Sequence, residues 1–588
     1  MLAFWVLVVI IGLTARVLSL IRYHIANTRA GWQDLPLEEH GNDAEHDNRR
    51  RKGMLRLHTW MQRHVTIPAM FGYRASQPFG WYTVPPRLQS LTIFSFVIMN
   101  IFLCAHGYRV FQDNLYFPEV HTQAWRYVSD RTGIISFANF PLIWLFGIRN
   151  NLLLWLTGWS FGTYNNFHRW VARVATVQAV VHSIGYTVLV FDSGGWPLFI
   201  DYWKQFWWTT GELATISMCA LIPLSIYYMR RNVYELFLLI HIALSITILA
   251  TMWGHVSIFK GHYEGLVWVC CAIWMLDRIS RVIRTLAFNR LFWTTRARAT
   301  YDSSANIVRL SIPYRNSLYR PKPGTFYYLQ LLSDYRFWES HPFTMAGIQS
   351  QDDTKAAEAV AQQSILIHET ASLLSRPDPS ASLSALQVSE SCMTFLVRPY
   401  DSFTSRLRDA ASHSYPHPTY LPILVEGPYG DSQPLHRYQQ TIFMVGGSGI
   451  VVPLVHLERL CKDNTTTRSI HITWAAREPA FIESCLQQDF GNFQDAFDSG
   501  KLFMDIFITG LYDSSKWQGL PKAIQLFQGR PTVKGQIQDF LEDYGSRATT
   551  AVVSCGPSSM NDDVRKAVTD ILGDERYSIE FFQESFNW

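Results

Sequence analysis

Hydrophobic residues in the first half of the chain occur in long runs separated by short polar connections. A helix needs about 20 apolar residues to cross the hydrocarbon of a bilayer. Seven runs come close to that length, and they cover residues 2–22, 88–110, 133–157, 168–191, 208–228, 233–255 and 263–283. The first run carries Arg16 and lacks a basic leading segment, which favours a transmembrane span over a signal peptide. The pattern predicts a helical membrane bundle of about seven spans.

After about residue 290 the apolar stretches become short and alternate with polar positions. Several short strands with turn signals between them indicate a small antiparallel β-barrel, with strands expected at 299–312, 325–332, 393–398 and 420–425. Residues 350–391 are rich in Gln, Ser, Ala and Asp. This composition is typical of an insertion without a packed core.

Strands and helices alternate in the last third of the chain, as in a Rossmann-like α/β domain with a parallel sheet. Strands are expected at 441–445, 469–475, 503–508 and 551–554, and helices at 454–462 and 559–572. The expected organisation is an N-terminal transmembrane helix at 1–23, a cytosolic loop at 24–87, a transmembrane domain at 88–290, a barrel domain at 295–435 and an α/β domain at 436–588.

Basic residues in the short loops predict the orientation of the bundle. They cluster at 49–52, at 230–231 and at 278–290, which all fall on one side if seven spans alternate. That side is therefore expected to be cytoplasmic, together with the C-terminal half. The formal net charge is only +4, without a basic stripe interleaved with aromatic residues, so a nucleic-acid partner is not expected. The eight cysteines form no CxxC pattern, which predicts neither a disulfide framework nor a zinc site.

Four histidines lie in the apolar segments as two equally spaced pairs: His168 with His182, and His241 with His255. Fourteen residues of helix span about 21 Å and return to within about 40° of the same face. Two such helices side by side would present two facing couples at two depths. Neutral imidazole is a standard haem-iron ligand. The spacing predicts two stacked bis-histidine haems, with His168 facing His241 near the cytoplasm and His182 facing His255 near the outer face.

The four histidines also fit roles without haem. Each could bond a carbonyl or line a cavity, or they could be proton-relay residues of a transporter with a regulatory nucleotide-binding domain. Arg131 and Arg149 flank the third expected span. They could bind the anionic propionates of haem, since an arginine at membrane depth needs an anion. Interfacial snorkelling explains both arginines equally well, so both possibilities stay open.

A glycine-rich turn, Gly446-Gly447-Ser448-Gly449, separates an expected strand from an expected helix. Glycines permit close backbone approach, and a helix N-terminus supplies amide donors, so this arrangement predicts a phosphate cradle. Arg477 follows the second strand of the domain. An arginine there can hold the 2′-phosphate of NADP, although a surface arginine without that role is the alternative.

Several motifs occur in a fixed order along the chain. They are Phe167-His168-Arg169-Trp170, the two histidine pairs, His341-Pro342-Phe343-Thr344, GPYG at 427–430, GGSGI at 446–450, Cys555-Gly556-Pro557 and a terminal aromatic residue. Because these motifs occur in this order, the chain resembles the ferric reductase and NADPH oxidase superfamily, and most of all the fungal ferric-chelate reductases. The resemblance covers about residues 88–588.

The resemblance implies a role for each motif. The four histidines would ligate two haem b groups. FAD would bind at His341, Pro342, Phe343 and Thr344, with further contacts from Arg398, Thr404 and Gly427. NADPH would bind at Gly446, Gly447, Ser448, Gly449, Arg477, Cys555, Gly556 and Pro557. Cys555 would approach the nicotinamide, and Trp588 would cover the flavin until the nicotinamide displaces it.

Two positions depart from the family pattern. Asp401-Ser402-Phe403-Thr404 stands in place of a glycine-containing phosphate loop. Pro453 stands one place later than in many relatives. The sequence also lacks an EF-hand loop, which argues against a calcium-regulated oxidase.

The resemblance implies a plasma-membrane oxidoreductase with its FAD and NADPH domains in the cytosol. Electrons would pass from NADPH through FAD and two haems to a ferric or cupric chelate on the opposite side of the membrane. The alternative is a superoxide-producing NADPH oxidase. Membrane lipid and the metal chelate are the expected partners, and an iron-uptake permease or oxidase would suit such a reductase. The natural acceptor metal and the oligomeric state stay open.

Overall fold

The computed structural model describes residues 1–30, 56–80, 82–349, 391–400, 402–462, 465–511, 517, 520–543, 548–574 and 576–584. The chain divides into two compact units, 1–280 and 281–587, and each is described by itself. The expected insertion at 350–391 lies outside the described residues apart from its last position, and Trp588 lies outside them as well.

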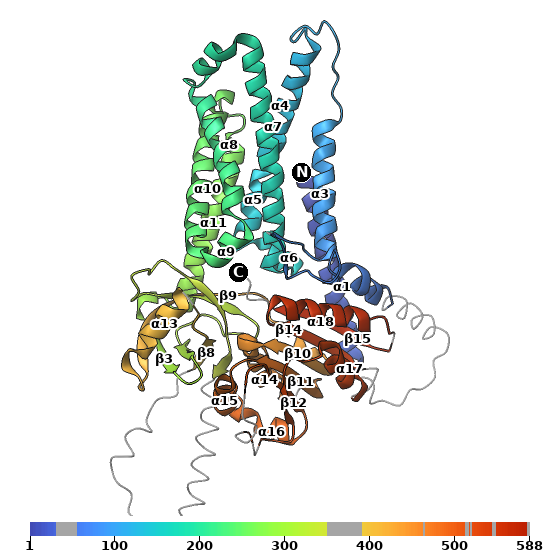
Figure 1. Ribbon diagram of the computed structural model, residues 1–588, viewed down its shortest axis with the longest axis vertical. Helices are drawn as coiled ribbons and strands as arrows, with labels where there is room; N and C mark the ends of the chain where they lie inside the picture. Colours follow the sequence, from blue (N-terminus) through green and yellow to red (C-terminus); the bar gives the residue numbers. More distant parts are fainter. Residues whose placement is uncertain are drawn as a thin grey trace, which may run out of the picture. The chain divides into compact units, whose positions relative to one another are not determined.

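The first unit is helical, and its long helices run lengthwise beside one another (Figure 1). A short hairpin joins β1 (Pro78–Phe79) to β2 (Tyr82–Thr83). The helices are α1 (Leu2–Ala30), α3 (Arg87–Ala105), α4 (Val120–Ala138), α5 (Phe140–Gly147), α6 (Leu152–Thr157), α7 (Phe161–Tyr202), α8 (Phe206–Leu224), α9 (Tyr227–Asn232), α10 (Tyr234–Val256) and α11 (Glu264–Phe288), the last of which continues into the second unit.

Three of the described helices are long and apolar enough to cross a membrane, at residues 87–105, 161–202 and 234–259, and a shorter apolar helix covers 2–17. The expected count of seven spans is therefore not confirmed. Charged residues explain part of the difference, because α4 carries Arg126, Asp130 and Arg131 along its length. α11 likewise carries acidic and basic residues in its second half.

The prediction of one helix over 133–157 is wrong. α4 begins at Val120 and ends at Ala138, and the short helices α5 and α6 follow. The break lies at the buried Asn139, whose side-chain amide donates to Gln178 Oε1 on α7 (3.3 Å). Gln178 in turn donates to Asn100 Oδ1 on α3 (3.0 Å). Buried amides must bond one another in an apolar bundle, so this polar cluster holds the chain where the helix is interrupted.

The turn between α5 and α6 is held by a buried carboxylate. Asp277 on α11 is 1% exposed, and its Oδ1 accepts hydrogen bonds from the backbone N (3.0 Å) and side-chain Nδ2 (3.1 Å) of Asn150. Arg278 pairs with the other carboxylate oxygen. The next residue, Asn151, caps α6 by accepting from Leu153 N (2.9 Å). The acidic residue inside the apolar segment therefore fixes a loop.

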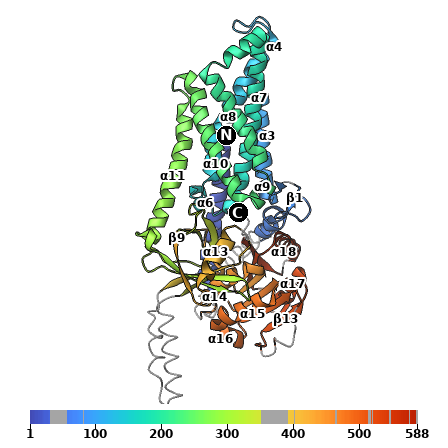
Figure 2. The ribbon, with the colours of Figure 1, turned by 60° about the vertical axis from the view of Figure 1, so that its left-hand side comes forward.

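Helix pairs form the body of the bundle. α4 packs along α7, α8 packs along α10, and α7 also contacts α8. The first helix belongs to this unit, because the ring of Trp5 lies 4.8 Å from Phe146 and 5.0 Å from Phe167 between ring centroids. Helices α10 and α11 belong to the same bundle (Figure 2). The ring centroids of Trp253 on α10 and Trp268 on α11 lie 4.6 Å apart.

The second unit contains a curled antiparallel sheet with the order β6-β5-β9-β3-β4-β8-β7. Its strands are β3 (Arg296–Asp302), β4 (Ile307–Pro313), β5 (Phe326–Leu331), β6 (His341–Thr344), β7 (Gly347–Gln349), β8 (Cys392–Val397) and β9 (Thr419–Tyr429). The edge strands β6 and β7 are separated by only two residues in the chain, so the sheet must curl until its edges approach. The expected barrel is therefore a half-barrel: an open, curled sheet with β6 and β7 as its two edge strands.

The single strand predicted at 299–312 is in fact a hairpin of β3 and β4. The side chain of Asp302 accepts hydrogen bonds from the backbone N of Ser304 (3.1 Å) and of Ala305 (3.2 Å), as in an Asx turn. Asn306 completes the turn with a φ of 48°. The helix α13 (Phe403–Ala411) packs on this sheet.

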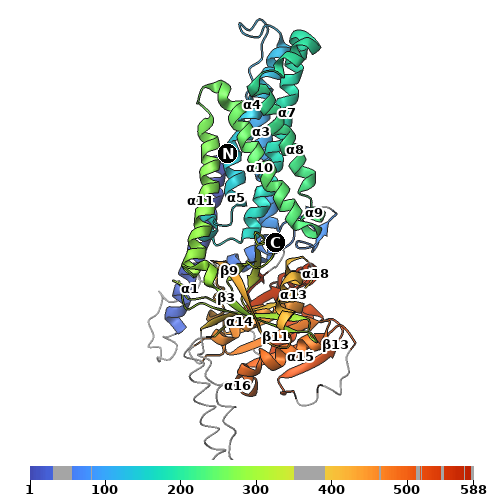
Figure 3. The ribbon, with the colours of Figure 1, turned by 90° about the vertical axis from the view of Figure 1, so that its left-hand side faces the viewer.

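The remainder of the second unit is a six-stranded parallel sheet with the order β13-β12-β11-β10-β14-β15, which confirms the predicted α/β domain (Figure 3). Its strands are β10 (Gln440–Gly446), β11 (Ser469–Ala476), β12 (Leu502–Ile508), β13 (Ile524–Gln528), β14 (Thr549–Cys555) and β15 (Ser578–Glu584). The flanking helices are α14 (Val451–Leu460), α15 (Pro479–Gln488), α16 (Gln494–Asp498), α17 (Val533–Asp543) and α18 (Ser558–Ile571). The order reverses between β10 and β14, where ligands bind in sheets of this type.

The last turns of α11 bind the end of β9 within the second unit. Arg281 donates to both carboxylate oxygens of the buried Glu426, through Nε (2.9 and 3.0 Å) and Nη2 (2.9 Å). The hydroxyl of Tyr429 donates to the same carboxylate (2.5 Å), and the guanidinium of Arg284 lies 4.6 Å from the Tyr429 ring centroid. This network fixes the GPYG turn against the helix.

Acid should destabilise the α/β domain through His456 on α14. Burial, followed by the nearby charge of Arg459, lowers the pKa of His456 to about 4. The unfolded chain binds a proton at this residue below about pH 6.5, whereas the folded chain does so only near pH 4. Folding stability is therefore lost as pH falls through this window. We expect His456→Gln to lose less thermal stability than the wild type between pH 7 and pH 4.5. Parallel melting curves at every pH would contradict this assignment.

Candidate functional site

The first unit, residues 1–280, is called the membrane unit below. It brings the four predicted histidines together in the two expected couples. His168 and His182 lie on α7, and His241 and His255 lie on α10. The ring centroids of His168 and His241 are 6.1 Å apart with an interplanar angle of 59°. Those of His182 and His255 are also 6.1 Å apart, at 85°. The two couples therefore have the same separation at two levels of the bundle.

This separation suits one metal ion within each couple. A histidine nitrogen binds a transition metal at about 2 Å. Two imidazoles on opposite sides of one ion thus place their ligating nitrogens about 4 Å apart and their ring centroids about 6 Å apart. The observed distances match this arrangement, so the couples can each hold an iron ion between two rings.

The outer nitrogens of the rings bond to neighbouring helices. Nδ1 of His168 lies 2.8 Å from the carbonyl oxygen of Ile143, and Nδ1 of His182 lies 2.8 Å from that of Ser129. Nδ1 of His255 lies 2.9 Å from the carbonyl oxygen of Trp207. A carbonyl oxygen only accepts, so these Nδ1 atoms carry the hydrogen. In the neutral ring, Nε2 is then left with the lone pair that binds a metal.

The fourth histidine has a different partner. Nδ1 of His241 lies 3.4 Å from the hydroxyl oxygen of Ser225, which follows the end of α8. A hydroxyl both donates and accepts, and the distance is long. This ring is therefore held less firmly than the other three.

The two arginines predicted to meet propionates both lie in the membrane unit. The guanidinium of Arg131 on α4 donates to the carbonyl oxygen of His106 and lies 4.3 Å from the ring centroid of Tyr108. Arg149 lies in the turn between α5 and α6, beside the Asn150 that binds Asp277. These contacts leave the propionate role of both residues a prediction.

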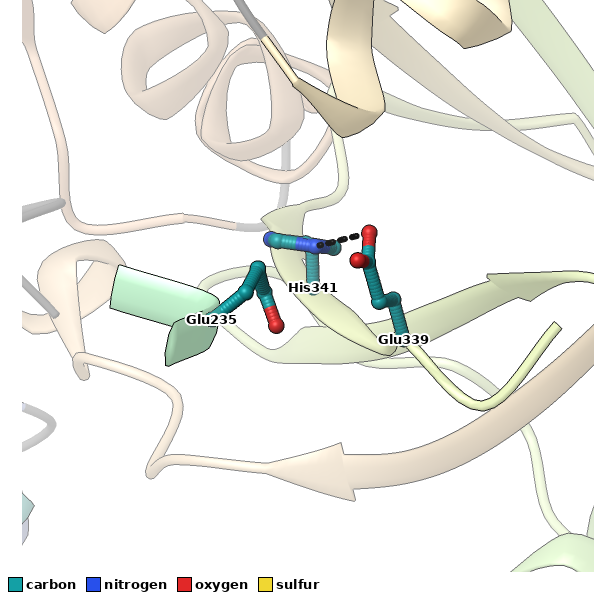
Figure 4. Close-up of side chains that lie close together, drawn as sticks. All are labelled: Glu235, Glu339 and His341. Carbon is teal, nitrogen blue, oxygen red and sulfur yellow. Dashed lines mark ion pairs between the residues drawn. The ribbon is translucent and has the colours of Figure 1, made fainter. Parts of the chain in front are cut away.

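The predicted flavin segment His341-Pro342-Phe343-Thr344 forms the edge strand β6. The ring of His341 stacks on Phe403 with a centroid separation of 4.5 Å. Its Nε2 lies 3.9 Å from Glu339 Oε2, an ion pair when the histidine is protonated (Figure 4). Glu339 also pairs with Arg406, which binds Asp334. A charged network thus surrounds the start of β6.

The remaining predicted flavin residues lie around the same curled sheet. Arg398 follows β8 and pairs with Glu478, next to the predicted Arg477. Thr404 accepts from the backbone N of Tyr400 (3.0 Å) and so fixes the loop before α13. Gly427 in β9 passes so close to Tyr327 that a Cβ would lie 2.4 Å from its ring. Only glycine allows this approach.

The glycine turn and the Cys555-Gly556-Pro557 segment meet where the parallel strand order reverses. A Cβ on Gly449 would lie 2.3 Å from the carbonyl oxygen of Cys555, and one on Gly446 would lie 2.7 Å from Pro557. Gly447 has a φ of 55°, which favours glycine. Two backbone segments are thus packed without side chains between them, at the edge where a dinucleotide binds in this fold.

The thiol of Cys555 is buried at the end of β14. Burial, followed by the charge of Glu584, raises the pKa of this thiol well above its usual range, so it stays protonated. Glu584 is its partner in register on β15. Burial raises the pKa of Glu584 to about 7. No motif in the sequence points to Glu584, and its place in the strand pairing is the signal that identifies it.

Arg477 follows the end of β11 and is exposed, as a residue that meets a bound phosphate would be. Gly510 lies close to it, because a Cβ there would be 2.2 Å from the Arg477 carbonyl oxygen. The position agrees with the predicted strand end. Trp588 lies outside the described residues, so its predicted role is not tested.

Three family descriptions match consecutive parts of the chain. "Ferric reductase like transmembrane component" matches residues 132–252, "FAD-binding domain" matches 293–433, and "Ferric reductase NAD binding domain" matches 438–569. Ferric reductase transmembrane component 6 of Saccharomyces cerevisiae is 25% identical over 91% of this chain and 72% of its own length. Component 3 of the same yeast is 26% identical, with the same coverage.

The chain is a homologue of the fungal ferric reductases. It is also 26% identical to the yeast "Ferric/cupric reductase transmembrane component 2", over 90% of this chain and 71% of that protein. Among solved structures, a flavohemoglobin from Malassezia yamatoensis is 13% identical over 80% of this chain and 99% of that chain, with a TM-score of 0.35.

In the order of the sequence, the matches to known families give a transmembrane reductase domain, then an FAD-binding domain, then a nicotinamide-nucleotide-binding domain. The second unit contains both of the corresponding sheets. This ferric reductase homologue is therefore an integral membrane oxidoreductase of the flavin-dependent kind.

Gly449→Ala should disrupt nucleotide binding by this ferric reductase homologue. The new Cβ would collide with the backbone of Cys555, and overpacking costs typically about 1–3 kcal/mol. We expect roughly tenfold or greater weakening of NADPH binding, measured by titration of the purified protein. Gly491→Ala is the matched control, because a Cβ there meets nothing within 4 Å. Equal affinities in both variants would contradict the close-packing role.

Proposed function

We propose that this chain is a ferric-chelate reductase that carries electrons from cytosolic NADPH, through FAD and two bis-histidine haem b groups, to a ferric or cupric chelate across the membrane. The observation that carries the proposal is the pair of histidine couples, each with ring centroids 6.1 Å apart. Three of the four rings are oriented by carbonyl oxygens so that Nε2 is the free ligand atom. Four unrelated buried histidines would have no reason to form two couples with the same separation between ring centroids.

The residues present fit the groups that the proposal requires. His168 with His241 would hold one haem, and His182 with His255 the other. The residues around β6 and α13 would hold FAD, and the two close-packed backbone segments around Gly449 would hold the nucleotide. When bound, these groups supply the redox chemistry, since flavin accepts two electrons together and haem iron carries one at a time.

The chain's own residues have defined tasks in this scheme. The carbonyl-bonded Nδ1 atoms fix the orientation and tautomer of the ligating rings. Because two histidines would hold each iron, the metal acceptor would be reduced without binding to that iron. The protonated thiol of Cys555 presents a neutral group toward the nucleotide site, with Glu584 beside it.

The proposal extends to organisation and location. Residues 295–435 would bind FAD and residues 436–588 would bind NADPH, both in the cytosol. With the seven expected spans alternating, the basic loops lie on the cytosolic side, which supports this orientation by the positive-inside rule. A relative described as "Probable cell surface ferric reductase kap2" of Aspergillus oryzae is 26% identical over 65% of this chain and 47% of that protein, which supports the plasma membrane as the location.

Haem content tests the central claim. The purified wild-type protein should contain roughly two haems per chain by the pyridine-haem assay, since each couple holds one iron. His182→Ala should contain roughly one. His262→Ala, in an exposed loop of the same unit, is the control and should keep both. A wild-type content near zero would refute the proposed function.

The acceptor separates a metal reductase from a superoxide-producing oxidase. Membranes that contain the protein should reduce a ferric chelate with NADPH in the absence of oxygen, measured by trapping of Fe(II). A protein that forms superoxide in air and leaves ferric chelate unreduced under anaerobic conditions would instead be an oxidase.

Arg477→Ala should reduce the preference for NADPH over NADH. A hydrogen bond from a charged group is worth about 1.5–3 kcal/mol, so the ratio of kcat/KM values should fall roughly tenfold or more. Arg530→Ala changes another exposed arginine of the same unit and should leave the ratio unaltered. An unchanged ratio in Arg477→Ala would show that another residue selects the 2′-phosphate.

A further inference from the structure

Three of the four histidines place Nδ1 beside a backbone carbonyl of a neighbouring helix, and in each case a glycine lies at the same distance along that helix. His168, His182 and His255 each place Nδ1 beside a carbonyl oxygen, those of Ile143, Ser129 and Trp207. In every case the residue four positions later is a glycine: Gly147, Gly133 and Gly211. In an α-helix a carbonyl lies beneath the residue four positions on, since that residue's N–H points at it.

The missing side chains of these glycines leave the space that the rings occupy. A Cβ on Gly147 would lie 3.0 Å from Nδ1 of His168. A Cβ on Gly133 would lie 2.4 Å from Nδ1 of His182, and one on Gly211 would lie 2.3 Å from Nδ1 of His255. Contacts below 3.0 Å cannot persist, so at Gly133 and Gly211 any other residue would force the ring away from its carbonyl.

We propose that Gly133, Gly147 and Gly211 are positioning residues for the iron ligands. Each glycine opens a helix surface so that an imidazole reaches the carbonyl one turn earlier. The hydrogen bond holds the proton on Nδ1 and directs the lone pair of Nε2 toward the facing ring. Such bonds to a ligating histidine also raise its basicity. This inference rests on the proposed haem function.

His241 differs from the other three rings, because its Nδ1 bonds to no backbone carbonyl among the described residues. Its Nδ1 has only the hydroxyl of Ser225, at 3.4 Å. The couple of His182 and His255 is therefore oriented on both sides, whereas the couple of His168 and His241 is oriented firmly by His168 alone. Gly147 consequently governs the only carbonyl-bonded ring of that couple.

Close helix packing alone would also account for a glycine in a bundle. Gly12 is a glycine of that kind, because a Cβ there would lie 2.8 Å from the ring of Trp159, and its three nearest atoms belong to Trp159 and Thr157. Gly265 on α11 lies at the opposite extreme, with nothing within 4 Å of its Cβ position. These two positions provide a crowded control and an open control within the same unit.

The experiment uses the full-length, purified protein with five single substitutions: Gly133→Ala, Gly147→Ala, Gly211→Ala, Gly12→Ala and Gly265→Ala. Haem per chain is measured by the pyridine-haem assay, and the midpoint potential of each haem by optical redox titration. Loss of an outer partner typically weakens metal binding by about 10- to 100-fold. We expect Gly133→Ala and Gly211→Ala to fall from roughly two haems to roughly one.

Gly147→Ala is the milder substitution, because its Cβ would be 3.0 Å from the ring. We expect this variant to retain haem and to raise the midpoint potential of one haem only, since a less basic ligand stabilises ferric iron less. Gly12→Ala and Gly265→Ala should keep two haems at wild-type potentials. A purely structural effect would alter both haems together.

The outcomes separate the two proposals. A wild-type protein without haem refutes the proposed function itself. A wild-type protein with two haems, together with an unshifted Gly147→Ala and fully loaded Gly133→Ala and Gly211→Ala variants, overturns the positioning role alone. If Gly133→Ala or Gly211→Ala fails to fold, the potential of Gly147→Ala decides. Equal haem loss in Gly12→Ala would likewise overturn the role.

Discussion

A carbonyl oxygen can accept a hydrogen bond but cannot donate one, and the arrangement of the membrane unit depends on this asymmetry. The carbonyls of Ile143, Ser129 and Trp207 each decide which nitrogen of a facing imidazole carries the proton. In a medium with little water, a ring nitrogen without a partner is costly. The backbones of α4, α5 and α8 therefore set the protonation pattern of the couples that α7 and α10 present.

Sequence spacing predicted the couples because helix geometry is regular over the length of α7 and α10 that separates their histidines. The same reasoning failed at 133–157, where a regular helix would have continued. The break there lies where Pro141, in the first turn of α5, has no N–H to continue the preceding helix. The side chain of Asn139 also bonds at this point to Gln178, which is distant in the sequence. Hydropathy reports the local preference for a helix, but it does not report such a long-range bond.

The parallel sheet followed from local patterns, because its central strands are buried and its glycine turn gives a strong signal. The curled sheet was harder to predict from the sequence. Asp302 turns the chain through backbone hydrogen bonds in the middle of an apparently continuous strand. Glu584 became visible only once strand pairing placed it opposite Cys555. The glycines beside the histidines belong to the same class, since their meaning depends on a partner helix.

The pairing at one edge of the curled sheet has an evolutionary consequence. Gln349, the last residue of β7, lies opposite Cys392, the first residue of β8. The chain between them begins and ends at two directly paired residues, so the distance between its ends is fixed by the sheet. Doubling the length of a connection with fixed ends costs only about 0.6 kcal/mol. We therefore expect relatives with a longer or shorter connection at this point to keep the same sheet, because the change costs little stability.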